Sequence, residues 1–147
     1  MKPAARLAGA LLLVLVASTF TARAQVPFNQ GPVTRVVLIS ILPGHSDAFF
    51  ADLKKNVVPL WEAEKKAGLI VDYSLFLNQV PSGANDWDFG YTLTYKNMAA
   101  LDGLPDKVYE LRMKQYGSKD DEQKVIEKRV ENAKIFSSSL LRDITLR

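Results

Sequence analysis

The sequence predicts a single α+β domain in which helices cover one face of a four-stranded antiparallel sheet. Segments typical of strands and helices follow one another in the order strand, helix, strand, strand, helices, strand. One of these segments, residues 86–95, alternates aromatic or apolar residues with small or polar ones throughout, which indicates a strand with one buried face. The chain has 147 residues, enough for one domain of ordinary size after removal of a leader.

Four segments are predicted as strands. Residues 33–42 are rich in Val and Ile, and this strand is expected to be buried on both faces. Residues 69–79 and 86–95 flank the turn-forming sequence Pro-Ser-Gly-Ala-Asn at 81–85, which predicts an antiparallel hairpin. Residues 140–147 form the last predicted strand.

A first helix is predicted over residues 47–67, because the apolar residues of this segment recur at helical spacing. Ser46 or Asp47 can cap its start, and Gly68 can adopt the left-handed conformation that often ends a helix. Pro59 lies inside the segment and lacks a backbone N–H, so a kink or break is expected just before it.

A second helical region begins at Asn97, is interrupted at 103–105 and ends at Gly117. Ser118 can then cap an extra helix over residues 118–136, which mixes charges of both signs. A solvated helix face is the simplest explanation of this charge pattern. A lid over the mouth of a pocket is the alternative, and only the position of this helix before the last strand suggests it.

The first 24 residues are predicted to be a signal peptide. Two basic residues precede an apolar stretch centred on 11–16, and the triplet Ala-Arg-Ala at 22–24 has the small-x-small pattern of a cleavage site. The uncharged segment 7–22 is shorter than the roughly 18 to 20 residues that span a bilayer. Cleavage after Ala24 is therefore expected rather than an uncleaved anchor, leaving an exported, periplasmic or secreted domain of residues 25–147 with no membrane contact.

The charge and cysteine content exclude several functions. The chain carries 19 basic and 16 acidic residues, and the leader removes Lys2, Arg6 and Arg23, so 16 residues of each sign remain. Nucleic-acid binding needs clustered positive charge, and no nucleic-acid partner is expected for a neutral domain. The absence of cysteine excludes disulfide bonds and thiol catalysis.

The order of elements is best satisfied by the ferredoxin-like βαββαβ topology. The stretch 37–76, VLISILPGHSDAFFADLKKNVVPLWEAEKKAGLIVDYSLF, closes its first strand with Pro-Gly, carries Pro-Leu-Trp late in its helix and has a Gly before its second strand. In this layout the chain resembles the dimeric α+β-barrel superfamily, which includes antibiotic-biosynthesis-type monooxygenases, EthD-like proteins and NIPSNAP-like proteins. The resemblance implies a homodimer in which two sheets face each other and enclose a pocket. The helix at 118–136 is an addition to the simplest members.

The alternation of the strands separates two faces. If the odd positions of 69–79 and 86–95 face the helices, the opposite face is partly polar and partly apolar, which suits a pocket in a dimer. The reverse assignment, with the aromatic face in the pocket, stays open. Under the first assignment, the face away from the helices carries Ile70, Asp72, Ser74, Phe76, Asn78, Asp88, Thr92 and Thr94. Trp61, Trp87 and the tyrosines are expected mainly in the core, with contact to a pocket as the alternative.

Candidate site residues come from these strands and from one corner. Asp72 lies in the middle of a strand, where burial would raise its pKa and suit it to proton transfer. The alternatives are that it pairs with Arg35 or Arg142, or that it lies on a face exposed to water. His45, the single histidine, follows Pro-Gly at a strand-to-helix corner, where it either bonds locally or acts as a proton-transfer group at the rim of the pocket. The ligand-binding candidates are Asp72, Ser74, Phe76, Asn78 and Arg35.

No metal or cofactor is predicted. One histidine and no cysteine offer no pair of ligands at the usual spacing of a transition-metal site. The sequence Asn-Asp-x-Asp at 85–88 places oxygen ligands at nearby positions but lacks the rest of a calcium loop, so turn formation explains it better.

Three functions remain, and the third of them is an interaction or stress-response module without a pocket. The first is an exported homodimer of unassigned activity that binds a small, partly apolar molecule. The second, implied by the resemblance, is a cofactor-independent enzyme, a monooxygenase, isomerase or lyase acting on an aromatic or polyketide-like substrate. In that case Asp72, His45 and a tyrosine would transfer protons.

Overall fold

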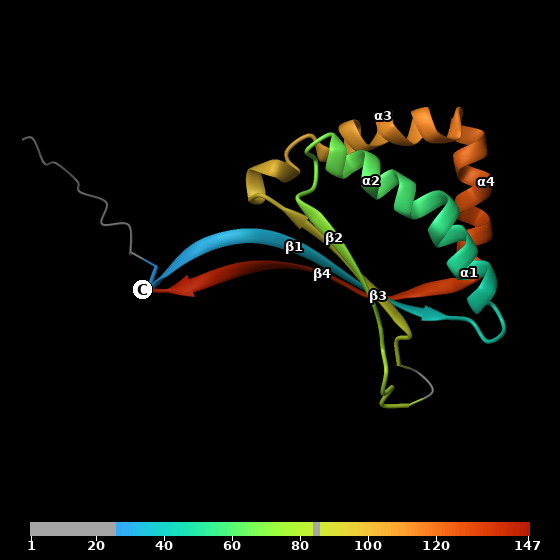
Figure 1. The fold of residues 1–147 in the computed structure, drawn as a ribbon, viewed down its shortest axis with the longest axis horizontal. Helices are drawn as coiled ribbons and strands as arrows, with labels where there is room; N and C mark the ends of the chain where they lie inside the picture. The colour runs from blue at the N-terminus through green and yellow to red at the C-terminus, as the bar shows by residue number, and fades with distance from the viewer. Residues whose placement is uncertain (1–25, 84–85) are drawn as a thin grey trace, which may run out of the picture.

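The computed structural model of the chain describes residues 26–83 and 86–147. The predicted signal peptide and Asn85 lie outside these residues. All helices lie on one side of the sheet, and the other side is uncovered (Figure 1). Within the described residues, no helix combines the length and the hydropathy needed to cross a membrane.

The helices and strands follow the predicted order. In chain order they are β1 (Phe28–Ile41), α1 (Ser46–Asp52), the π turn η1 (Leu53–Val57), α2 (Val58–Lys66), β2 (Asp72–Leu77), β3 (Phe89–Tyr95), the 3-10 helix η2 (Met98–Leu101), α3 (Leu104–Tyr116), α4 (Lys119–Val130) and β4 (Ala133–Leu146). The break expected before Pro59 is confirmed as the π turn that joins α1 to α2.

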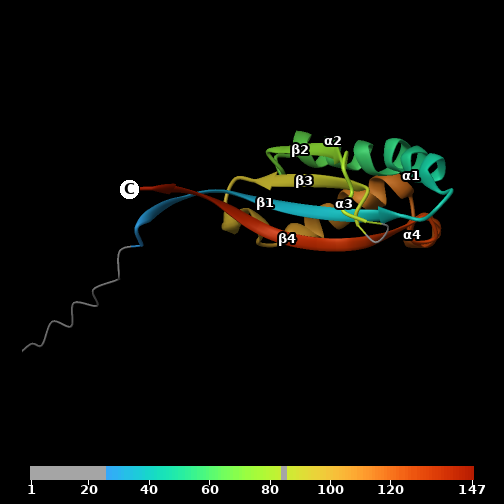
Figure 2. The same cartoon turned by 90° about the horizontal axis from the view of Figure 1, so that it is seen from below.

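The sheet has the strand order β2-β3-β1-β4, and every neighbouring pair is antiparallel. This order confirms the ferredoxin-like topology expected from the sequence. The outer strand β4 and its neighbour β1 each have 14 residues, and the paired strands extend well beyond the helical layer (Figure 2).

The apolar core lies between the helices and the sheet. Its buried members are Phe49, Leu53, Trp61, Ile70, Phe89, Leu93 and Tyr95. The three residues from β3 occupy odd positions, so the expected assignment of faces is confirmed for this strand. Ile70 was expected on the opposite face and this is wrong, because β2 begins only at Asp72 and the preceding turn directs Ile70 into the core.

Three expectations about the strands are wrong: two strands are shorter than expected, and a third is less buried. Segment 69–79 forms a strand only over β2, and segment 86–95 only from Phe89 onward. Trp87 therefore lies before β3 and does not follow the alternation of its side chains. Its ring packs on the ring of Phe76, with the ring centroids 5.7 Å apart. β1 is not buried on both faces: Val37 is buried against the helices, but Leu38 on the other face is only half-buried because no helix covers that face.

The extra helix is shorter than predicted and the last strand is longer. The helix was expected over 118–136, but α4 ends at Val130 and residues 133–136 belong to β4. Ile135 lies opposite Ile39 of β1, so pairing with a neighbouring strand outweighs the helical spacing of this segment. The expected cap of this helix is confirmed, because the Ser118 hydroxyl accepts the backbone N–H of Asp121.

The remaining ends of helices follow their predicted signals, with one exception. The Asn97 side chain accepts the N–H of Ala100, and Gly68 and Gly117 have the positive φ angles expected of glycines that end helices. The exception is α1: its N-cap position is His45, whose side chain makes no capping bond, so the expected caps at Ser46 or Asp47 are wrong.

Candidate functional site

Two adjoining cavities lie between the helices and the covered face of the sheet. Their volumes are about 230 Å³ and about 200 Å³. They share the wall residues Val57, Trp61, Tyr91 and Arg129, so they adjoin at these side chains, and together they are called the two-part cavity. Taken together, they fall in the lower part of the range of about 300–1,000 Å³ that is usual for small-molecule sites.

The first part of this cavity is apolar and aromatic. Phe49 and Phe89 meet edge to face in its wall, with their centroids 5.2 Å apart. Trp61 and Tyr91 stand between the two parts, and their ring centroids are 4.6 Å apart. Burial raises the pKa of the Tyr91 hydroxyl, with the guanidinium groups of Arg35 and Arg129 acting in the opposite direction. Tyr91 therefore stays neutral and offers a hydroxyl group in an otherwise apolar wall.

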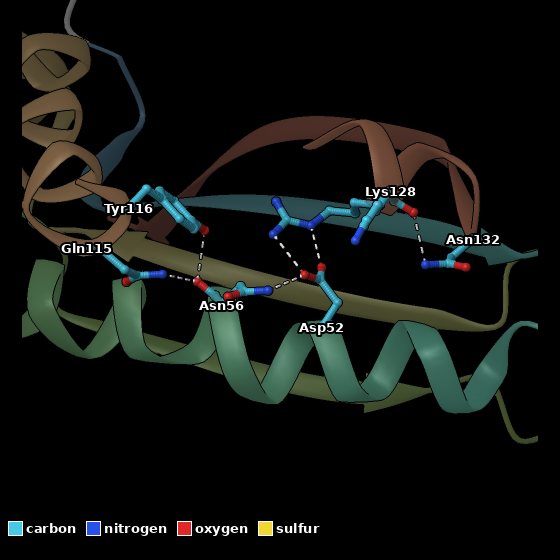
Figure 3. A network of polar contacts seen from close by, with 7 residues as sticks. Asp52, Asn56, Gln115, Tyr116, Lys128 and Asn132 are labelled. Atoms are coloured by element: carbon cyan, nitrogen blue, oxygen red, sulfur yellow. Dashed lines mark hydrogen bonds and ion pairs between the residues drawn. The ribbon is translucent and has the colours of Figure 1, made fainter. Parts of the chain in front are cut away.

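An ion pair closes one side of the cavity (Figure 3). The Arg129 Nε of α4 donates to Asp52 Oδ2 at 2.6 Å, and Asn56 Nδ2 donates to the other carboxylate oxygen at 2.7 Å. Burial lowers the pKa of Arg129, but the hydrogen bond and the charge of Asp52 more than offset this effect and leave the pKa raised. The pair ties α4 to the end of α1.

A second tie joins α3 to the π turn. The backbone carbonyl oxygen of Asn56 accepts a bond of 2.6 Å from Gln115 Nε2 and one of 3.2 Å from the Tyr116 hydroxyl. The π turn and the missing N–H of Pro59 disturb the regular i to i+4 bonding of the helix at this point. The turn thereby presents a backbone carbonyl to the neighbouring helix.

Charged side chains from two helices, Arg112 of α3 and Glu122 of α4, line the polar end of the cavity. The charge of Arg112 also acts on Glu64 of α2, which is not a wall residue of the cavity. Arg112 Nε of α3 lies 3.1 Å from Glu122 Oε1 of α4, and Glu122 is only 6% exposed. Glu64 of α2 is 4% exposed, and burial raises its pKa to about 7, although the charge of Arg112 acts to lower it. The half-buried Arg112 therefore pairs with the buried Glu122, and its charge also acts on Glu64, which changes its own charge near neutral pH.

The structure places Asp72 away from this cavity. Its carboxylate is exposed and lies 2.7 Å from Lys65 Nζ, and this hydrogen bond lowers its pKa. The expected burial with a raised pKa is therefore wrong, and so are the expected partners Arg35 and Arg142. Asp72 pairs directly with Thr94 in the sheet, and both lie on the uncovered face.

The other ligand-binding candidates do not converge on one site. Ser74 and Phe76 share the uncovered face with Asp72, and the ring of Phe76 lies over Gly90. Asn78 is occupied by the turn, because its Nδ2 donates to the backbone oxygen of Trp87 at 2.9 Å. Arg35 pairs with Leu93 and Leu140 in the sheet, so it lies on the helix-covered face, opposite to the other four candidates.

His45 forms a joint between distant segments. Its Nδ1 lies 2.9 Å from Asn132 Oδ1, and the backbone oxygen of Asn132 accepts the N–H of Leu42 at 2.9 Å. Asn132 follows α4 directly, so this joint fixes the end of α4 to the corner between β1 and α1. His45 does not line the two-part cavity.

The acidic residues near the hairpin act in the turn. Asp86 accepts the backbone N–H groups of Ser82 and Trp87, both at 2.8 Å, and Asp88 accepts that of Ile41 at 2.7 Å. Within residues 26–83 and 86–147, no three His, Cys, Asp or Glu side chains are grouped so that they could hold a metal ion.

Comparison with known proteins identifies relatives by fold. No family model matches the chain, and no curated protein matches its sequence. In structure it is similar to HapK from Hahella chejuensis, with a TM-score of 0.49, 10% identity, and coverage of 76% of this chain and 91% of that chain. It is also similar to a dimeric ferredoxin-like protein from an uncultured marine organism, with a TM-score of 0.48, 17% identity, and coverage of 81% of this chain and 98% of that chain.

A third similar structure is a DABB family protein with a ferredoxin-like fold from Mesorhizobium loti, with a TM-score of 0.41, 12% identity, and coverage of 80% and 100%. Several of the similar structures are dimeric ferredoxin-like proteins. The expected resemblance is thus confirmed as a likeness of fold. At these identities it concerns the fold alone, and the function is argued below from the residues of this chain.

Proposed function

We propose that this protein binds a small, uncharged and partly apolar molecule in the cavity between its helices and its sheet. The observation that carries the proposal is the aromatic wall at Trp61 and Tyr91, next to the hydrogen-bonded ion pair of Asp52 and Arg129. A charged ligand would have to compete with Asp52 or Glu122 for a buried partner, which is costly. A neutral molecule with one polar group can instead bond to the Tyr91 hydroxyl and stack on the rings.

The test uses a neutral fluorescent probe, N-phenyl-1-naphthylamine, with the purified domain of residues 25–147. We expect saturable binding that is lost in Ile126→Trp, because Ile126 lines the cavity and the larger ring fills it. Tyr109→Trp is the matched control, since Tyr109 lies on the same helical hairpin, is 43% exposed and does not line the cavity. Probe binding that persists unchanged in Ile126→Trp would contradict the assignment of the site.

The proposal includes export and a homodimer. The uncovered face of the sheet carries apolar side chains, among them Phe76 and Leu38, and Leu141 of β4 on this face is 53% exposed. Such a surface is better suited to a second copy of the chain than to water. Light scattering should give twice the mass of one chain, and Leu141→Lys should reduce it to one, while Tyr109→Lys should leave the dimer intact. A wild-type monomer would contradict this part.

One observation favours a second function, cofactor-independent proton transfer. A general base works best when its pKa lies near the operating pH, and Glu64, a buried carboxyl group on which the charge of the cavity residue Arg112 acts, has this property. The base would then be Glu64 rather than Asp72 or His45. On a panel of aromatic and polyketide-like substrates, Glu64→Gln should abolish turnover and the exposed Glu62→Gln should not. Equal turnover in both variants would contradict this function.

A further inference from the structure

We propose that the α3–α4 hairpin is a gate, which lifts as a unit to admit molecules to the cavity and is held shut by two polar latches. This inference rests on the proposed binding function for its purpose. The proposed movement of the hairpin rests only on the contacts that the hairpin makes.

The hairpin packs on the apolar core at its two ends and not between them. Leu104, at its start, and Ala133, just after it, pack against the apolar core. None of the residues 105–132 belongs to that core or is among the half-buried apolar residues packed on it. Segments with few buried apolar contacts open locally at a free energy below that of global unfolding. The hairpin is thus the part of the helical layer that is most easily separated from the sheet.

The ends are built for such a movement. Gly103, directly before α3, has a φ angle of +65°, and Gly117 between the helices has +80°. At the other end, the bond between His45 and Asn132 fixes the point at which α4 joins β4. The hairpin therefore begins after a glycine, which has no side chain to restrict rotation of its backbone, and ends at a hydrogen-bonded joint at Asn132.

The latches lie between these points. The first is the ion pair of Arg129 with Asp52, and the second is the pair of bonds from Gln115 and Tyr116 to the Asn56 carbonyl. Both end on the segment Asp52–Asn56, at the end of α1 and in the π turn. Both span the cavity edge, because Asp52, Asn56, Tyr116 and Arg129 are all wall residues. Opening the latches therefore opens the cavity.

The chain offers an internal reporter of this opening. It has two tryptophans, so Trp87→Phe leaves Trp61 alone, and Trp61 is 5% exposed in the cavity wall. In this background, acrylamide quenching of Trp61 should increase several-fold in Asp52→Asn and in the double variant Gln115→Ala/Tyr116→Phe. Asp72→Asn, which breaks the exposed pair with Lys65, is the matched control and should leave the quenching unchanged. Equal quenching in all variants would overturn the gate.

Hydrogen exchange separates local opening from global unfolding. Amides of α3 and α4 should exchange at least about tenfold faster than those of β1 and β3 in the unchanged protein, and the latch variants should widen this difference. Exchange of the hairpin at the same rate as the central strands would overturn the proposal.

The rate at which N-phenyl-1-naphthylamine binds then distinguishes the gate from the binding function. With the gate, the latch variants should bind the probe with a several-fold higher association rate constant. Probe binding at an unchanged rate, together with a hairpin as protected as β1, would overturn the gate and leave the binding function standing. A hairpin that opens in a protein that binds no probe would support the gate and contradict the proposed binding site.

Discussion

The two helical segments above the sheet are attached to it by different forces. The first, α1 with η1 and α2, inserts Phe49, Leu53 and Trp61 into the apolar core. The second, the α3–α4 hairpin, buries no apolar residue fully, and Glu122 is its single buried side chain. The comparison shows how one domain can combine a fixed half with a movable half. Apolar burial determines the fold, and directional polar bonds determine whether the cavity is open.

The largest difference between the halves should appear when core side chains are removed. Trp61→Ala should lower the free energy of unfolding by about 3–5 kcal/mol, because it leaves a large cavity among rings that cannot close over it. Ile126→Ala in α4 should cost less than about 1.5 kcal/mol, since its side chain is only half-buried. Urea denaturation followed by circular dichroism measures both values. Equal losses would mean that the hairpin belongs to the same packed unit as α1 and α2.

The second prediction concerns the buried carboxyl group that faces the hairpin. The pKa of Glu64 is about 7 in the folded chain, against 4.5 as its ordinary value. The folded state therefore holds this proton more tightly than the unfolded state, and the free energy of unfolding falls as the pH rises from about 4.5 to about 7. The full effect is at most about 3 kcal/mol, and it is constant above this window.

Glu64→Gln removes the titrating group, so the free energy of unfolding should no longer fall between about pH 4.5 and about pH 7. The variant should be more stable than the unchanged protein at pH 8 and nearly equal to it at pH 4.5, as measured by urea denaturation at several pH values. Glu62→Gln is the control, because Glu62 is exposed and bonds to Tyr73 at the surface. A stability difference between Glu64→Gln and the unchanged protein that is independent of pH would contradict the assignment of this charge.

The topology was predictable because each of its signals is local. Alternation indicated β3, and Asn97, Gly117 and Ser118 marked ends of helices through the geometry of single turns. The end of α4 was not predictable in this way. Residues 133–136 continue the helical spacing, and only the presence of β1 beside them makes them part of a strand. The position of the strand partner is a property of the whole fold.

The cavity was harder to foresee than the topology. Asp72 attracted notice because it interrupts an apolar strand, yet it lies at the start of β2 with one side in water. The residues that matter, Asp52, Glu64 and Glu122, resembled ordinary charges on helix surfaces. A signal existed for one of them: Glu64 follows Trp61 by three positions and so lies on the buried stripe of its helix. Its partner Arg112 is distant in the sequence and could not be inferred from spacing.

The smallest of the three effects gives the sharpest view of the latches, because two of the carboxylate ion pairs in the described residues differ mainly in burial. Asp52 and Arg129 have side chains that are 16% and 33% exposed, whereas Asp72 and Lys65 are 61% and 45% exposed. Asp52→Asn should cost about 1–3 kcal/mol, because it leaves a half-buried guanidinium without its charged partner. Asp72→Asn should have little effect, since water and salt screen that pair.

A double-mutant cycle isolates each pair from its surroundings. Asp52→Asn combined with Arg129→Met should give a clear coupling free energy that changes little between about 0.05 and about 0.5 M NaCl. Salt in this range screens the attraction between exposed charges much more than that between buried charges. Asp72→Asn combined with Lys65→Met should give a coupling close to the measurement error, and salt should remove the remainder. If both cycles gave the same small coupling, the Asp52 pair would be too weak to hold the hairpin, and the bonds to the Asn56 carbonyl would have to keep the cavity closed alone.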